Sequence, residues 1–169
     1  MNTHTPSVLL LGVDPGYDRC GIAVVEHIQG VRETLVYSVC ETTVRGSPFE
    51  ERLVSVGNAL RDCIQTFKPT MCAIEKVYFT SNQKTAMHVA EVRGACLYIA
   101  RSHGLTIQEF TPNEIKVAIA GDGRADKKQV TYMVDKLIRI EKKITYDDEY
   151  DAIAVALTAA ATLASRRDY

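Results

Sequence analysis

The chain has 169 residues, of which 46% are hydrophobic and 24% charged, with a formal net charge of −1 at pH 7. This size and composition are typical of one globular domain and exclude a low-complexity or collagen-like chain. No apolar run approaches membrane-spanning length, and residues 1–7 lack a signal-peptide pattern, so we expect a cytoplasmic protein with no membrane contact.

The first expected elements are two strands joined by a tight connection. Residues 8–13 are an apolar run typical of a strand buried on both faces, and the run ends at Asp14, followed by Pro15 and Gly16. Proline and glycine end or bend a strand, and a second apolar run follows at residues 21–25 with hairpin spacing. Asp14 is therefore expected at the end of a central strand, although an acid here can also simply cap the turn.

The next elements are a more exposed strand and a helix. Partial alternation over residues 31–43 predicts a third strand, and the short connections favour an antiparallel arrangement of the first three. Ser47, Pro48 and Glu50 match a helix start with a serine N-cap, a proline in the first position and a capping box. Apolar residues at helical spacing then continue until Pro69.

A second buried strand again ends in an acid. Residues 71–74 are apolar and lead into Glu75, with Tyr78 and Phe79 just beyond it. Residues 80–101 predict a long helix with a stripe of small residues around Gly94. Glycine in a helix costs about 1 kcal/mol relative to alanine, which indicates a close contact either within the fold or across a dimer.

The last third of the chain is mostly helical and locally basic. We expect a strand over residues 105–110, a capped short helix over residues 111–120, and helices over residues 126–138 and from residue 147 or 148 onward. The basic residues of this region include Lys116, Arg124, Lys127 and Lys128. Such a basic face can bind phosphates, or it can be an ordinary solvated surface.

Acids from three separate segments are expected to meet. Asp14 and Glu75 end buried strands, whereas Asp148 and Asp151 are three residues apart and share one face of the last helix. Burying like-charged carboxylates together is costly unless a cation compensates them. Oxygen ligands without a histidine or cysteine cluster suit Mg²⁺ or Mn²⁺, and such a site can hold two ions. For Asp148 alone, the general preference for acids in a first helical turn is the alternative.

Three sequence patterns carry a family resemblance. LGVDPGYDRCGIAVV, AIEKVYF and DDEYDAIAVA, in this order and spacing, resemble RuvC-type Holliday-junction resolvases of the RNase H-like superfamily. The similarity spans nearly the whole chain and includes the stretch PNEIKVAIAGDGRADKKQV. It implies an α/β fold and a single RNase H-like nuclease domain over residues 1–169. The implied sheet is mixed and five-stranded, with three antiparallel strands and then two parallel ones, flanked by helices.

The resemblance also implies a catalytic site. The family's four catalytic and metal-binding acids correspond to Asp14, Glu75, Asp148 and Asp151. Together they would hold two Mg²⁺ ions per subunit, with Mn²⁺ as the alternative metal. Asp147 lies four residues before Asp151 and is the alternative ligand to Asp148. Lys127 would stabilise charge that develops at the phosphate.

The same resemblance implies DNA binding and a reaction. Lys116 would position the DNA backbone and Lys127 would lie at the phosphate. From the local basic cluster, Lys128 and Arg124 are further expected DNA-binding residues. Tyr78 would stack on an unpaired base at the junction, unless it is an ordinary core tyrosine. The implied enzyme is a crossover junction endodeoxyribonuclease that cuts four-way DNA junctions in pairs, leaving 5′-phosphate and 3′-hydroxyl ends.

The implied partners follow from the symmetry of a four-way junction. Paired cuts need two sites, which a homodimer supplies, and a branch-migration helicase is a further expected partner. Two other functions stay open on the residues alone. One is a related RNase H-like nuclease acting on RNA or other branched nucleic acid, and the other is a non-catalytic junction-binding module.

Overall fold

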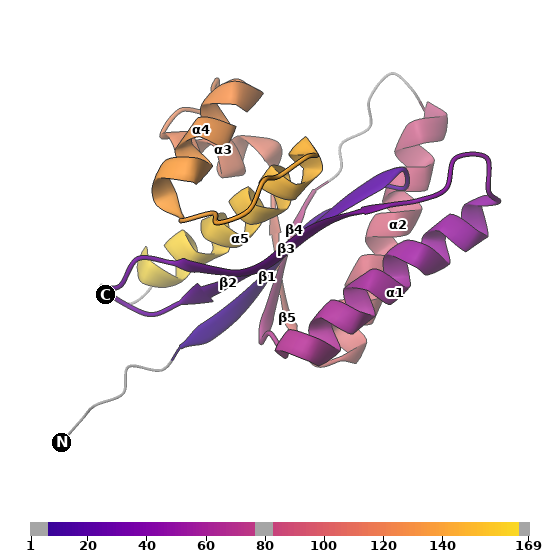
Figure 1. The fold of residues 1–169 in the computed structure, drawn as a ribbon, viewed down its shortest axis with the longest axis horizontal. Helices are drawn as coiled ribbons and strands as arrows, with labels where there is room; N and C mark the ends of the chain where they lie inside the picture. The colour runs from indigo at the N-terminus through magenta and orange to yellow at the C-terminus, as the bar shows by residue number, and fades with distance from the viewer. Residues whose placement is uncertain (1–6, 77–82, 166–169) are drawn as a thin grey trace.

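The computed structural model describes residues 7–76 and 83–165, which form a mixed sheet covered by helices on both faces (Figure 1). The elements in chain order are β1 (Val8–Asp14), β2 (Arg19–His27), β3 (Thr34–Thr42), α1 (Phe49–Phe67), β4 (Met71–Glu75), α2 (Gln83–Ser102), β5 (Thr106–Phe110), α3 (Pro112–Ala120), α4 (Lys127–Leu137) and α5 (Asp147–Ser165). Within the described ranges, every helix is too short or too polar to cross a membrane.

The sheet has the strand order β3-β2-β1-β4-β5. β1 pairs antiparallel with β2, and β2 pairs antiparallel with β3. β1 pairs parallel with β4, and β4 pairs parallel with β5. This arrangement confirms the expected fold class, in which three antiparallel strands are followed by two parallel ones.

Each face of the sheet has its own hydrophobic core. α3, α4 and α5 cover one face, and α1 and α2 cover the other (Figure 1). Along β1, Leu10 belongs to the core under α5, whereas Leu11 belongs to the core under α1 and α2. Because side chains alternate along a strand, Asp14 lies on the face covered by α5. Glu75 lies on that face as well, since it is two residues beyond Ala73 of the same core.

The start of α1 differs from the expected capping box. The helix begins at Phe49 with Pro48 as its N-cap, and no side-chain hydrogen bond caps it. Ser47 instead belongs to the preceding turn, where its backbone N–H donates to the Val44 carbonyl at 3.3 Å. The Pro48 carbonyl accepts from the backbone N–H groups of Glu51 and Arg52, and Glu50 makes no capping hydrogen bond.

The starts of α3 and α4 are fixed by reciprocal capping boxes. Thr111 and Glu114 form the expected box before α3. Asp126 and Gln129 form a second box before α4, which makes Lys127 the first residue of that helix. The box fixes where α4 begins, and from its first position Lys127 pairs with Asp147 and Asp151 of α5.

Candidate active site

Asp14 and Glu75 lie beside each other at the carboxyl ends of the neighbouring strands β1 and β4. Val13 and Ile74 are partners in the parallel pairing of β1 and β4, so the residue that follows each one ends its strand at the same level. Both acids lie on the face covered by α5. Two parallel strands thus place two carboxylates under the beginning of the same helix.

Glycines let the first turns of α5 approach these strand ends closely. A methyl group on Gly21 would overlap with the carbonyl oxygen of Asp148, and one on Gly12 would overlap with that of Ala152. Gly21 is the antiparallel partner of Asp14, so the close approach occurs directly beside the strand-end acid. The absence of these two side chains is the local reason why α5 can bring its acids to the strand ends.

The four acids at the start of α5 lie in three different environments. Asp148 and Asp151 lie on the side of Asp14, since both raise its pKa. Glu149 is buried on another side, where it accepts a hydrogen bond from Ser38 at 2.7 Å and pairs with Lys142. Asp147 has a side chain that is 48% exposed. The helix therefore presents Asp148 and Asp151 to the strand ends and anchors itself to β3 through Glu149.

The strand-end carboxyls titrate far from their ordinary range. Burial raises the pKa of Asp14 well above its usual value, and the nearby charges of Asp151, Glu75 and Asp148 raise it further. Burial, followed by the charge of Asp151, raises the pKa of Glu75 to about 7. Carboxyl pKa values that burial and a specific neighbouring charge shift this far are typical of functional sites. The four acids therefore share one electrostatic environment, as expected for ligands of a cation.

Lys127 lies among these acids. Its Nζ atom is 2.8 Å from Asp151 and 2.6 Å from Asp147. The hydrogen bond from Lys127 lowers the pKa of Asp147 to about 2. Burial raises the pKa of Asp148, and Asp148, unlike Asp147, acts on Asp14. These contacts favour Asp148 over the more exposed Asp147 as the partner of the strand-end acids.

Arg19 is a second cation at the site, and the sequence patterns did not single it out. Its Nε atom lies 2.9 Å from Oδ2 of Asp148, and its Nη2 atom lies 3.5 Å from Asp147. The Asp148 Oδ2 atom is nevertheless buried without an aligned hydrogen bond. Arg19 begins β2, directly across the hairpin from β1, so only the strand register places it near the last helix.

The chemistry of the donor set fits divalent cations. The acids offer only carboxylate oxygens, which Mg²⁺ and Mn²⁺ prefer, and Asp148 Oδ2 is a buried acceptor that lacks an aligned donor. In the described part of the chain, no three histidine, cysteine, aspartate or glutamate side chains are drawn together into a preformed metal-binding group. Metal binding at Asp14, Glu75, Asp148 and Asp151 thus requires the carboxylates to approach one another around the ion.

The predicted DNA-binding residues differ in how close they lie to the acidic site. Lys116 is close enough to the site to lower the pKa of Glu75, as Lys127 does. Arg124 and Lys128 are exposed and form no ion pair with a described residue, so they belong to the outer surface near α4. Tyr78 lies outside the described residues.

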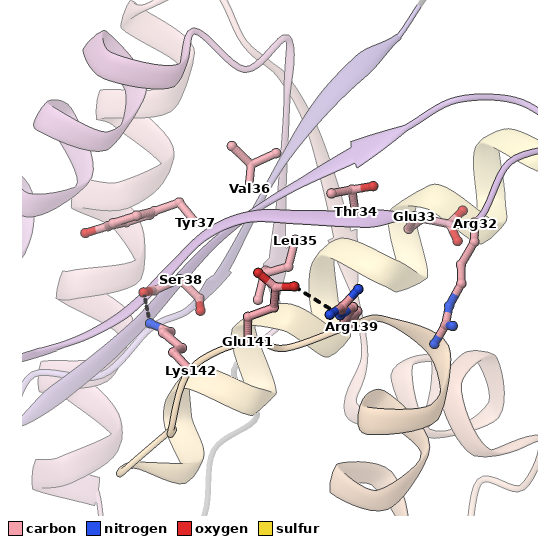
Figure 2. A pocket seen from close by; sticks show the side chains of 10 residues that line it. All are labelled: Arg32, Glu33, Thr34, Leu35, Val36, Tyr37, Ser38, Arg139, Glu141 and Lys142. Atoms are coloured by element: carbon pink, nitrogen blue, oxygen red, sulfur yellow. Dashed lines mark hydrogen bonds and ion pairs between the residues drawn. The ribbon is translucent and has the colours of Figure 1, made fainter.

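A separate groove of about 810 Å³ runs along the edge strand β3 (Figure 2). Its cations already have partners in the fold. Arg139 lies 3.0 Å from Glu141, while Lys142 pairs with Glu149 and donates to the Ser38 carbonyl. Arg32 donates to the carbonyl of Leu137 at 2.8 Å. The Lys142 contact fastens the segment between α4 and α5 to β3, and the Arg32 contact joins the loop before β3 to the end of α4. The strand-end acids do not line the groove.

Comparisons with known proteins point to one family. Residues 10–159 match the family model of the crossover junction endodeoxyribonuclease RuvC. The RuvC of Moorella thermoacetica is 41% identical over 150 residues, covering 89% of each chain. The RuvC of Petrotoga mobilis is 38% identical over 149 residues, covering 88% of this chain and 91% of its own.

Solved structures show the same similarity. The T. thermophilus RuvC in complex with a Holliday junction substrate superposes with a TM-score of 0.86 at 27% identity, covering 94% of this chain and 96% of its own. The yeast mitochondrial Holliday junction resolvase Ydc2 superposes with a TM-score of 0.73 at 11% identity, covering 99% of this chain and 84% of its own. At that identity the yeast protein supports the fold alone.

Proposed function

The chain belongs to the RuvC family of crossover junction endodeoxyribonucleases, and we propose that it cuts four-way DNA junctions at the site formed by Asp14, Glu75, Asp148 and Asp151. One observation carries this assignment of residues. Acids from two parallel strand ends and one helix start share a single electrostatic environment on one face of the sheet. As a single domain over residues 1–169, the chain supplies all four acids itself.

The acids are proposed to bind two Mg²⁺ ions per subunit, and Mn²⁺ would serve in their place. When bound, the ions supply Lewis acidity that activates water and stabilises the leaving oxygen of the phosphodiester. The chain contributes the backbone positions from which the carboxylates would approach the ions, and rigid strand ends and a closely packed helix determine those backbone positions. Attack in line with the leaving oxygen would yield a 5′-phosphate and a 3′-hydroxyl.

Lys127 and Lys116 are proposed to act on the phosphate. Lys127 pairs with Asp147 and Asp151, so its ammonium lies beside one of the four site acids. A fixed cation there stabilises the negative charge that develops in the transition state. Lys116 acts on Glu75 from the side of α3 and would contact the neighbouring backbone. Arg124 and Lys128 are more peripheral and would contribute to non-specific DNA attraction.

A homodimer would provide the two sites that paired, symmetric cuts need. Met87, Glu91, Gly94 and Tyr98 recur at helical spacing along α2 and are exposed. A methyl group on Gly94 would meet no described atom within 4 Å, so packing within the monomer does not account for this glycine. The Tyr98 side chain is 75% exposed and Met87 is 56% exposed. We therefore propose this face of α2 as the dimer interface, and delivery of the junction by a helicase stays a prediction.

Cleavage of defined substrates tests the proposal. The wild-type chain and an Asp14→Asn variant would be incubated with a four-way junction, a linear duplex and a structured RNA, in Mg²⁺. We expect wild type to cut the junction and to spare the other two. The Asp14→Asn variant should bind the junction but lose most of its cleavage rate, by about 10²-fold or more, since a metal ligand is worth several kcal/mol at the transition state. Equal cutting of all three substrates would favour a nuclease of broader specificity, and normal cutting by the variant would exclude the proposed site.

A further inference from the structure

A second pocket, of about 360 Å³, adjoins the acidic site at the same end of the sheet. Its lining residues are Asp18, Arg19, Thr42, Thr43, Arg45 and Tyr146. Arg19 is shared between the two, because its guanidinium also lies beside Asp148. We propose that this pocket binds a backbone phosphate of the DNA strand close to the phosphate that is cut.

The strand register explains why the pocket and the acids share one face. Arg19 and Thr42 are partners in the pairing of β2 and β3, and Gly21 is the partner of Asp14. Arg19 is two residues from Gly21, so side-chain alternation places both on the face covered by α5. Two residues of a strand span about 7 Å, which equals about two base rises of 3.4 Å along a DNA strand. A phosphate in the pocket would therefore lie about two nucleotides from the one that is cut.

The donors in the pocket suit a phosphate. Arg19 carries five N–H groups, and its contact with Asp148 Oδ2 includes no aligned hydrogen bond, so its side chain, which is 43% exposed, keeps donors for a ligand. The Tyr146 ring lies 5.4 Å from the Arg19 guanidinium and limits its position. Arg45 is exposed and forms no ion pair with any residue that the structure describes. Planar guanidinium groups bind phosphate oxygens in a bidentate manner, which favours this ligand over a neutral one.

The acid in the pocket is already compensated. Asp18 pairs with Arg52, whose guanidinium also donates to the Thr43 hydroxyl at 2.8 Å. The Thr43 hydroxyl in turn donates to the Tyr17 carbonyl at 2.7 Å. These bonds fix the pocket wall and leave Arg19, Arg45 and the exposed Thr42 hydroxyl to face a ligand.

The inference rests on the proposed junction-cutting function, and the test separates the two. Binding to a four-way junction would be measured as a function of salt concentration in an Asp14→Asn background, which prevents cutting. The variants would be Arg45→Ala and Arg19→Ala, with Arg61→Ala as the control. Arg61 is also exposed, but it lies on α1 across the sheet, where it donates to Asn58 at 2.8 Å. Thermal melting of each variant would establish that it folds.

We expect Arg45→Ala to reduce the slope of log Kd against log salt concentration by about one, as for one lost phosphate contact, and Arg61→Ala to leave it unchanged. A scan of uncharged methylphosphonate linkages around the cut should weaken Asp14→Asn binding at one position, and Arg45→Ala should remove that sensitivity. Unchanged slopes and an unchanged scan in Arg45→Ala, with wild type still cutting junctions, would overturn this inference alone. Failure of the wild-type chain to bind or cut junctions would overturn the proposed function and the inference with it.

Discussion

Replacing Glu75 with glutamine should stabilise the metal-free protein at neutral and higher pH. Burial and the charge of Asp151 raise the pKa of Glu75 to about 7, so its ionised form is unfavourable in the folded chain. A carboxyl group whose pKa is higher in the folded protein than in the unfolded chain binds its proton more tightly in the folded protein. Protonated Glu75 therefore contributes to stability, and this contribution is fully present below the pKa of the unfolded chain. That stability is lost as pH rises through the folded pKa. Glutamine keeps the shape of the side chain and removes the charge.

The size of the effect follows from the two pKa values. The increase from 4.5 to about 7, at about 1.4 kcal/mol per pH unit, gives an upper limit of about 3 kcal/mol at pH 8. Partial contact with solvent reduces this, so we expect Glu75→Gln to gain about 1–3 kcal/mol in the free energy of unfolding at pH 8. At pH 4.5 the gain should fall below about 0.5 kcal/mol, because Glu75 is then mostly protonated in the folded protein.

Urea unfolding in EDTA at several pH values between 4.5 and 8 measures this difference. Asp62→Asn is the control, since Asp62 is exposed on α1 and loss of its charge should change the stability by less than about 0.5 kcal/mol at any pH. Addition of Mn²⁺ should reverse the order, because the wild-type chain gains the free energy of metal binding. A variant that is no more stable than wild type at pH 8, or a gain that does not depend on pH, would refute the reasoning.

Three further changes test other parts of the site. Gly21→Ala should cost about 1–3 kcal/mol of stability by overpacking against the Asp148 carbonyl, and it should slow junction cleavage. Urea unfolding and a cleavage assay measure both effects, and a variant as stable and as active as wild type would contradict the close α5 contact. Lys127→Met should reduce the cleavage rate by about 10²-fold. It should change stability by less than about 1 kcal/mol, because the lysine side chain is 53% exposed. A large loss of stability without a loss of cleavage rate would contradict the role of Lys127 at the phosphate. Tyr98→Glu should shift the molecular mass in solution from dimer to monomer in light scattering, and a mass that does not change would remove α2 as the interface.

The positions of the strand-end acids could be predicted from the sequence because the signals are local. An apolar run that ends in Asp14 before proline and glycine, and another that ends in Glu75, mark strand ends without knowledge of the fold. The two faces of α5 could not be separated in this way. Asp147, Asp148 and Glu149 are consecutive, and only the packing against β3 shows that Glu149 turns away to Ser38.

Two other features depended on contacts distant in the sequence. Arg19 reaches Asp148 across 129 positions through strand register, which composition and spacing do not reveal. The capping box at Ser47 and Glu50 failed because it is a short pattern that a turn can also satisfy. The chain bonds Ser47 to Val44, and the helix starts after Pro48.

The most direct test of the site is the position of a divalent ion in crystals of the protein soaked with Mn²⁺, located by anomalous diffraction. We expect anomalous density between the carboxylates of Asp14, Glu75, Asp148 and Asp151, at ligand distances of about 2.0–2.3 Å. The density should disappear in Asp14→Asn. Density at another surface, or the same density in Asp14→Asn, would contradict the proposal that these acids hold the catalytic metal.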